Sequence, residues 1–290
     1  VLGQSTFTTS TAATTQAGLR TPKASIFDPI NNRLFVADTI NSRVLVYNLA
    51  DGLTNGENAV NVLGVANFTT TGGGATQAGF NSPGGIAYDS VNSRLFVADS
   101  NQNRVMVFDV ASITNGENAI NVLGQANFTT TTAAVTQAGL NSPTGLVYDA
   151  ANSRLFVSDL SNNRVMVFDV ASITNGENAI NVLGQANFTT STGGGSQSGF
   201  LGPMGAAYDL SSSRLFVSEF NRNRVMVFDV ASITNGENAI NVLGQANFGV
   251  NVAATTQAGL HFAYGVAYDY ISSRLFVSDF NNSRIMVFNA

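Results

Sequence analysis

The chain has 290 residues, a formal net charge of −5 at pH 7 and no cysteine. The lack of cysteine excludes disulfides, thiolate metal sites and a cysteine nucleophile. The acidic balance disfavours a nucleic-acid partner, which normally requires a basic face. No apolar run in the sequence approaches the ~20 residues of a membrane span, so we expect no membrane insertion.

A repeat of about sixty residues organises the chain. Val-Leu-Gly begins at Val1, Val62, Val122, Val182 and Val242, so successive copies lie 61, 60, 60 and 60 residues apart. Such regularity is typical of repeat architectures. The sequence therefore predicts a single β-propeller domain over residues 1–290, with repeat units 1–61, 62–121, 122–181, 182–241 and 242–290.

Each unit contains four short apolar segments separated by turn residues. In the third unit, we expect strands at 145–149 (strand a), 154–159 (strand b), 164–170 (strand c) and 179–184 (strand d). Their Ile, Leu, Val, Phe and Tyr content, with Asn, Ser and Gly between them, predicts an antiparallel four-stranded blade. Near-continuous apolar runs such as 165–168 indicate that a blade is buried on both faces.

The two ends of the chain predict how the fifth blade is completed. Residues 285–289 form a c strand with no d strand after it, and residues 1–3 form a d strand with no c strand before it. Pairing these strands would remove two free sheet edges. The predicted fold is an all-β, five-bladed β-propeller with four antiparallel strands per blade, closed by this pairing. An open solenoid that stacks with other chains is the alternative.

Three motifs resemble the NHL-repeat β-propellers. In the third unit they read Pro143-x-Gly145-Leu-x-Tyr-Asp149, Arg154-Leu-Phe-Val-x-Asp159 and Asn163-Arg164-Val, and the pattern recurs in all five units. Ala24, Glu219 and Ala263 are mild departures from it. The resemblance implies the fold but leaves the activity open, because such propellers include protein-binding and RNA-binding modules as well as lyases.

Two columns of carboxylates recur in the repeat. One follows strand b, as at Asp159, with Arg164 five residues later; the other precedes the a–b turn, as at Asp149, with Arg154 after it. A carboxylate and a guanidinium at this spacing can pair and cap backbone donors. A ring of carboxylates that holds a metal is disfavoured because the arginines compete for the charge. We predict neither a metal site nor another cofactor.

His261 is the only histidine of the chain. A two-histidine metal site is therefore impossible, and a Ser-His-Asp triad would have to be built around this residue. Nothing in the sequence around it marks a nucleophile. The resemblance implies that NHL-like lyases use histidines or metal ligands, which this chain largely lacks, so we predict no catalytic residue.

The copies differ mainly on one side of the repeat. Residues 165–190 repeat residues 105–130 without a change, whereas the d–a connection, the start of strand a and the b–c loop vary. In an antiparallel blade the d–a and b–c connections emerge on the same face, and long loops often carry function. At the mouth of strand a, we expect an axial opening surrounded by Lys23, Gly84, Thr144, Met204 and Tyr264.

Units four and five carry an unusual set of side chains on this variable face. Aromatic residues, Met and Arg are enriched in the cores of interfaces. We therefore predict a partner-binding surface, which we call the rim patch, at Leu201, Met204, Phe220, Arg222, His261, Phe262, Tyr264 and Phe280. The alternative is that duplication missed these segments and that their aromatic rings pack into the long loops.

These features favour a non-enzymatic propeller that binds a protein or glycan partner through its loop-rich face. The wealth of Thr, Ser, Asn and Gly, with Lys23 as the single lysine, is typical of an extracellular or cell-surface protein. One alternative is a structural module that decorates a larger extracellular assembly. Another is a lyase or hydrolase with an axial pocket. The sequence leaves the identity of the partner and the oligomeric state open.

Overall fold

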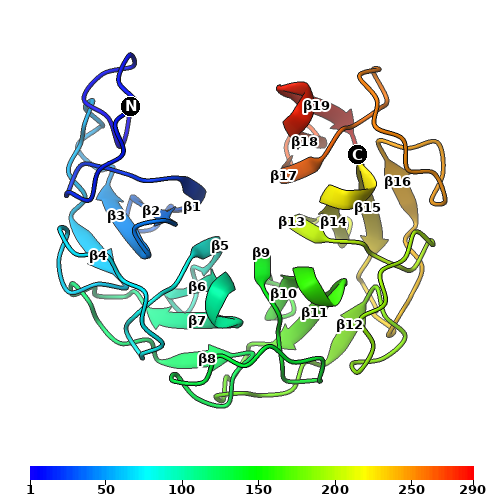
Figure 1. Ribbon diagram of the computed structural model, residues 1–290, viewed down its shortest axis with the longest axis horizontal. Coiled ribbons are helices and arrows are strands. Elements are labelled where there is room, and N and C mark those ends of the chain that lie inside the picture. The colour runs from blue at the N-terminus through cyan, green and yellow to red at the C-terminus, as the bar shows by residue number, and fades with distance from the viewer. The chain divides into compact units, whose positions relative to one another are not determined.

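The structure is a computed structural model that describes residues 1–290, and it is built almost entirely from strands (Figure 1). Its nineteen strands form four sheets of four strands and one sheet of three. All neighbouring strands within a sheet are antiparallel. The predicted five-bladed β-propeller is thus confirmed. None of its short 3-10 turns has the length or the apolar character to cross a bilayer.

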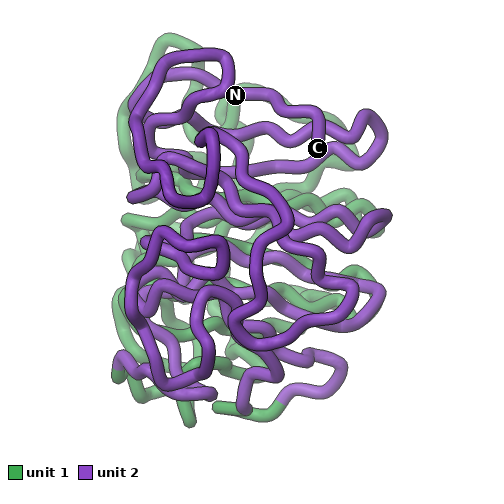
Figure 2. The backbone as a smooth tube through the Cα atoms, turned by 90° about the vertical axis from the view of Figure 1, so that its right-hand side faces the viewer, with its two compact units in different colours: residues 1–132, 174–177 green, residues 133–173, 178–290 purple.

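The first compact unit comprises Val1–Thr132 and Thr174–Glu177 and holds two blades (Figure 2). Blade one consists of β1 (Pro22–Asp28), β2 (Arg33–Asp38), β3 (Arg43–Asn48) and β4 (Asn61–Leu63). Blade two consists of β5 (Pro83–Asp89), β6 (Arg94–Asp99), β7 (Arg104–Asp109) and β8 (Asn121–Leu123), with the turn η1 (Ser100–Gln102) after β6.

The second compact unit comprises Ala133–Ile173 and Asn178–Ala290 and holds three blades. Blade three consists of β9 (Pro143–Asp149), β10 (Arg154–Asp159), η2 (Leu160–Asn162), β11 (Arg164–Asp169) and β12 (Asn181–Leu183). Blade four consists of β13 (Pro203–Asp209), β14 (Arg214–Glu219), η3 (Phe220–Arg222), β15 (Arg224–Asp229) and β16 (Asn241–Leu243). Blade five consists of β17 (Ala263–Asp269), β18 (Arg274–Asp279), η4 (Phe280–Asn282) and β19 (Arg284–Asn289).

Strand b matches the predicted bounds, whereas strands a, c and d differ from them at their ends. Strand d of blade three covers Asn181–Leu183 instead of 179–184. The Ala179 N–H leaves the sheet to donate to the Gln137 carbonyl at 2.9 Å. At the other end, Gly184 turns the backbone away with a φ of +89°, a conformation that glycine adopts readily.

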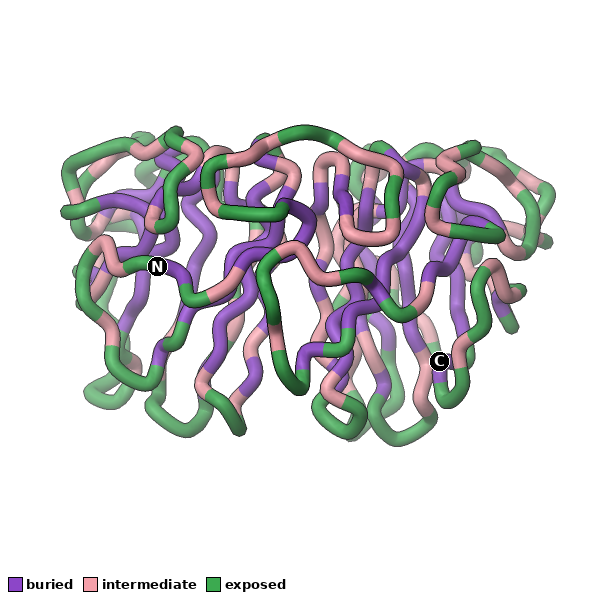
Figure 3. Tube along the Cα trace, turned by 90° about the horizontal axis from the view of Figure 1, so that it is seen from below, coloured by how far each residue is buried: buried purple, intermediate pink, exposed green.

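Within a unit, the facing sides of neighbouring blades are buried against each other. In the first unit, Phe35 of blade one packs with Ile86 and Phe108 of blade two. In the second unit, Phe156 of blade three packs with Leu215 and Phe228 of blade four. Figure 3 shows that buried residues follow the strands and exposed residues follow the connections. In blade three, strands β10 and β11 are buried on both faces, as their near-continuous hydrophobic runs predict. In blade five, Ile285 and Val287 of β19 are exposed.

The c–d turn of one blade also holds the d strand of the blade before it. The Val122 N–H in β8 donates to Asn175 Oδ1, and the Gly176 N–H donates to the Val122 carbonyl, each at 3.0 Å. The Val62 N–H is bonded to Asn115 in the same way. The invariance of the c–d turn among the copies therefore has a structural reason, because this turn is a joint between consecutive blades.

An ion pair anchors the long d–a connection in every blade, and it is fully buried in blades one to four. In blade three, Arg164 Nε donates to Asp159 Oδ2 at 2.8 Å, and both side chains are fully buried. Arg164 Nη2 donates to the Gly139 carbonyl at 2.9 Å, and Asp159 Oδ1 accepts from the Asn141 N–H at 2.6 Å. The same pair recurs at Arg43, Arg104, Arg224 and Arg284.

The second carboxylate column closes the a–b hairpin and connects blades. Arg154 Nη2 donates to Asp149 Oδ2 at 2.6 Å and to the Val230 carbonyl of blade four at 2.8 Å. Burial by itself would raise the pKa of Asp149, but hydrogen bonds from Asn152 and Arg154 outweigh it and lower that pKa. Both columns therefore hold the scaffold together.

The fifth sheet consists of β17, β18 and β19, so its completion by residues 1–3 stays a prediction. The repeat supplies the register for this pairing. In blade two, Val105 lies opposite Leu123 and Met106 opposite Val122. The equivalent positions put Ile285 opposite Leu2 and Met286 opposite Val1.

A disulfide tests this register in a chain that has no cysteine of its own. The double variant Leu2→Cys/Ile285→Cys should form an intramolecular disulfide under mild oxidation, because opposite residues of an antiparallel pair have Cβ atoms about 4.5–5.5 Å apart. Electrophoresis without reductant and mass spectrometry of the monomer measure it. In the control Leu2→Cys/Met286→Cys, the second side chain points to the other face. Equal cross-linking of both variants would contradict the register.

Candidate functional site

The d–a connection and the b–c turn of each blade meet in the second unit. In blade four, the Phe220 N–H of η3 donates to the Gly202 carbonyl at 3.2 Å. In blade five, the Phe280 N–H of η4 donates to the Phe262 carbonyl at the same distance. The two variable segments of the repeat thus form one continuous surface on each blade.

In blades three and four, an asparagine at the end of the b–c turn also holds the next blade. Asn163 and Asn223 both have a φ of +51°, which asparagine tolerates better than most residues. Asn163 Oδ1 accepts from the Gly202 N–H at 3.0 Å, and Asn223 Oδ1 accepts from the Phe262 N–H at 2.8 Å. The start of strand a is therefore fixed by the blade before it.

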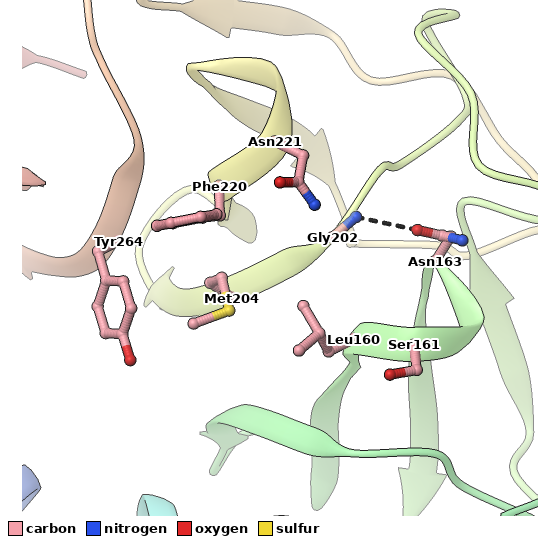
Figure 4. A pocket seen from close by; sticks show the side chains of 8 residues that line it. All are labelled: Leu160, Ser161, Asn163, Gly202, Met204, Phe220, Asn221 and Tyr264. Carbon is pink, nitrogen blue, oxygen red and sulfur yellow. Dashed lines mark hydrogen bonds between the residues drawn. The ribbon is translucent and has the colours of Figure 1, made fainter. Parts of the chain in front are cut away.

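A hollow of about 570 Å³ lies on this surface, within the second unit (Figure 4). It is formed by η2 of blade three, by β13 and η3 of blade four, and by the start of β17. Its size lies within the range of ligand pockets. The lining residues are Leu160, Ser161, Asn163, Gly202, Met204, Phe220, Asn221 and Tyr264.

Three polar groups of the lining have no hydrogen-bond partner within the protein. Asn163 is engaged on both sides, since its Oδ1 bonds Gly202 and its Nδ2 donates to the Ser191 carbonyl at 3.0 Å. In contrast, the hydroxyls of Ser161 and Tyr264 and the side-chain amide of Asn221 are free to bond a ligand. Burial raises the pKa of Tyr264, so its hydroxyl stays protonated at neutral pH.

Gly202 keeps the hollow open. Its φ is +72°, and a Cβ atom there would lie 2.7 Å from Asn221 Nδ2 and 3.6 Å from Leu160 Cδ1. The equivalent residue of blade five is Phe262, with a φ of +61°. Its ring stacks on Phe220 with centroids 4.3 Å apart and planes 14° apart. The same backbone position thus carries no side chain in blade four and an aromatic ring in blade five.

Aromatic residues of the predicted rim patch contact one another. Phe220 meets Tyr264 edge-on with ring centroids 6.1 Å apart, and Tyr264 lies 5.9 Å from Phe280. The His261 ring lies 4.8 Å from that of Phe262. Phe280 is 61% exposed. We call this group of five rings the aromatic cluster: Phe220, His261, Phe262, Tyr264 and Phe280.

The other members of the rim patch have different surroundings. Met204 lines the hollow. The Leu201 N–H donates to Glu219 Oε1 at 2.7 Å, and the Leu201 side chain covers Gly193. The Arg222 guanidinium occupies the space above Gly195, where a Cβ atom would collide with its Nη2.

The residues expected at the axial opening lie on three strands of the second unit and on two strands of the first, where β1 carries Lys23 and β5 carries Gly84. Thr144 Oγ1 of β9 donates to the Met204 carbonyl of β13 at 3.1 Å. β13 in turn packs against β17, which carries Tyr264. Lys23 is an exposed residue of β1.

Five lining residues of the hollow were absent from the predicted sites, namely Leu160, Ser161, Asn163, Gly202 and Asn221. Gly202 is the member that a comparison of the copies could have found. It is the only glycine in a column that otherwise reads Thr21, Ser82, Ser142 and Phe262, and all five residues have positive φ.

Blade four combines three exchanges that occur nowhere else in the chain. Glu219 replaces the aspartate of the buried ion pair, Arg222 replaces Asn or Gln, and Gly195 stands where the other blades have Thr14, Ala75, Val135 or Thr255. Because Arg222 lies in the space that a side chain at position 195 would fill, the last two exchanges depend on each other.

Gly195→Ala should therefore destabilise the protein, because the new methyl group collides with the Arg222 guanidinium. Because the guanidinium is the far end of a flexible side chain and can move aside, we expect a loss of about 1 kcal/mol or less in the free energy of unfolding, measured by denaturant titration. Gly194→Ala is the matched control, since the nearest atom to its Cβ would be 3.9 Å away. Gly195→Ala/Arg222→Asn should recover the stability. Equal effects of the two alanines would contradict this packing.

Burial raises the pKa of Glu219 to about 7, against the lowering effect of Arg224. A glutamate in an unfolded chain has a pKa of about 4.3. The folded state therefore holds the proton more tightly, and the resulting stability is fully present below pH ~4.3 and lost as the pH rises through ~7.

Glu219→Gln imitates the protonated side chain. We expect its free energy of unfolding to match that of the wild type at pH 4.5 and to fall less steeply up to pH 8, as measured by denaturant titration at several pH values. Burial also raises the pKa of Asp99, to about 6. Asp99 therefore contributes to the pH dependence of stability, but equally in both proteins. A loss of about 3–5 kcal/mol at every pH would instead show an ionised buried pair that the glutamine breaks.

The imidazole of His261 contacts an asparagine and a phenylalanine. Its Nε2 lies 3.3 Å from Asn281 Nδ2, and its ring faces Phe262. Its backbone N–H donates to Asp279 Oδ1 at 2.6 Å, which is the bond that Asn141 makes in blade three. No three His, Asp or Glu side chains of the chain converge as metal ligands do.

Comparison with known proteins finds relatives in sequence, although no protein-family model matches the chain. It is 30% identical to NHL repeat-containing protein 2 of Gallus gallus over 148 residues, which are 48% of this chain and 19% of that protein. The proteins of that name from Bos taurus and Homo sapiens are 29% and 28% identical over 150 and 142 residues, 49% and 47% of this chain and again 19% of each protein. The match spans about a fifth of the length of these relatives.

Among solved structures, similarity extends over 94% of this chain. A nidogen/laminin complex contains a chain that superimposes with a TM-score of 0.56 at 18% identity, over 82% of that chain. A structural genomics protein of unknown function from Bacteroides thetaiotaomicron gives a TM-score of 0.61 at 18% identity, over 61% of that chain. The repeat motifs, the sequence relatives and the five-bladed fold together confirm the resemblance to the NHL-repeat β-propeller family.

Proposed function

We propose that this propeller is a non-enzymatic module that binds a protein or glycan partner through the b–c turns and d–a connections of blades three to five. We place it in a secreted or cell-surface protein. The binding surface consists of the hollow beside Gly202 and the adjoining aromatic cluster. It combines recessed apolar area with unpartnered polar groups, as binding sites do.

The aromatic cluster is the observation that carries this proposal. Phe262 has a φ of +61°, which is a strained conformation for a bulky residue. Such strain persists only where the surroundings fix it, and it is concentrated at functional sites. The Phe220 ring and the Asn223 side chain hold Phe262 in place. Neighbouring rings that are fixed in this way lose little conformational freedom on binding, which favours affinity.

Two further observations support a binding role. One structural neighbour was solved as a nidogen/laminin complex, so a similar fold occurs in a complex of proteins. In addition, the carboxylates that could have served chemistry are engaged in the scaffold, as Asp159 is with Arg164. His261 contacts an asparagine and a phenylalanine.

Phe220→Ala/Tyr264→Ala tests the proposal against two probes, an array of immobilised extracellular protein domains and an array of immobilised oligosaccharides. The wild type should bind a member of one array. The affinity of the variant for that member should be lower by about 30-fold or more, since a central aromatic residue of an interface contributes about 2 kcal/mol or more.

Gly84→Ala/Ser100→Ala is the matched control, because it places alanines in the same two columns of blade two. It should bind like the wild type, and circular dichroism should show that both variants are folded. Unchanged binding by Phe220→Ala/Tyr264→Ala, or no binding of the wild type to either array, would contradict the proposal.

A further inference from the structure

The hollow beside Gly202 is lined by uncharged side chains only. A charged ligand would lose its hydration there without gaining an opposite charge, and that is unfavourable. The nearby Glu219 is already paired with Arg224. The lining therefore favours a neutral ligand.

The unpartnered polar groups of the hollow can all donate and accept hydrogen bonds. They are the hydroxyls of Ser161 and Tyr264 and the amide of Asn221. Figure 4 shows that they reach the hollow from different elements, Ser161 from η2, Asn221 from η3 and Tyr264 from β17. Ligand hydroxyls, which also donate and accept, would satisfy all three.

The rest of the lining is apolar. Leu160 lies on the side of blade three, Met204 in the middle, and Phe220 with Tyr264 on the far side (Figure 4). The face of an aromatic ring is negative and attracts C–H groups that carry partial positive charge. Such C–H groups cover one face of a sugar ring, because each of its carbons is bonded to oxygen.

We propose that the hollow binds a sugar residue of a neutral glycan, with its hydroxyls on Ser161, Asn221 and Tyr264 and its C–H face on Phe220 and Met204. This inference rests on the proposed function and names the partner class of the same surface. A peptide is the less suitable occupant, because extended peptides are commonly recognised through strand addition at sheet edges, whereas this hollow offers side chains.

Gly202 determines that the site is open in blade four. In blade five the equivalent Phe262 covers Phe220 with its own ring. A phenylalanine at position 202 would reach Leu160, which occupies the position of Phe220 in blade three, and would displace the Asn221 amide. Gly202→Phe therefore transfers the filled arrangement of blade five to blade four.

The probe is an array of immobilised neutral oligosaccharides, with sialylated and sulfated ones beside them. The wild type should bind neutral members, and titration with the best of these gives the affinity. Gly202→Phe should lower this affinity about tenfold or more, because its ring occupies the site. Ser82→Phe, which has the same substitution in the same column of blade two, is the matched control and should bind like the wild type.

Tyr264→Phe keeps the ring and removes only the hydroxyl, so it tests the site even if Gly202→Phe fails to fold. The loss of one hydrogen bond should weaken binding about fivefold. Binding only to sialylated or sulfated glycans would overturn the inference, as would a neutral glycan whose affinity neither Gly202→Phe nor Tyr264→Phe lowers.

The two proposals can fail separately. If the wild type binds only protein domains, and Phe220→Ala/Tyr264→Ala abolishes this binding, the proposed function stands and the sugar site is wrong. If the wild type binds neither proteins nor glycans, both are wrong.

Discussion

The buried arginine that begins strand c holds each blade together. In blade three, the Arg164 guanidinium bonds one carboxylate and the carbonyls of Thr136, Gly139 and Phe188. Those carbonyls belong to connections that have no strand partners of their own. A buried charge is expensive unless it is fully paired, so the arginine orders these connections only when every bond is made. The rigidity of the variable face thus depends on an invariant residue beneath it.

This scaffold explains why the copies vary where they do. Strand c and the c–d turn are bonded to two blades at once, through the arginine and through asparagines such as Asn175. A change there would disturb both blades. A few hydrogen bonds fix the backbone of the b–c turn and of the start of strand a. The side chains that point outward from these segments are free to change. Variation is therefore concentrated on one surface, where it changes the outward side chains without altering the frame.

The fold could be predicted from the sequence because the repeat supplies five copies of the same evidence. Apolar runs, turn residues and the paired columns gave strand positions that differ from the structure only at the ends, as at Ala179 and Gly184. The proximity of Phe220, Tyr264 and Phe280 could also be inferred from the sequence. Phe220 and Phe280 follow strand b and Tyr264 lies at the start of strand a, and these two ends meet on the same face of a blade. The hollow could not be inferred from the sequence, because it depends on the lack of a side chain at Gly202. The position of Arg222 likewise depends on Gly195, which lies 27 residues earlier in the chain.

The column of left-handed residues at Thr21, Ser82, Ser142, Gly202 and Phe262 has a consequence for how such a protein evolves. Each blade already has the unusual backbone there, so a substitution changes only what projects from it. Glycine leaves the hollow open in blade four, and phenylalanine covers Phe220 in blade five. A lineage can therefore open or close a recess in one blade at a time by point mutation, while duplication copies the frame unchanged.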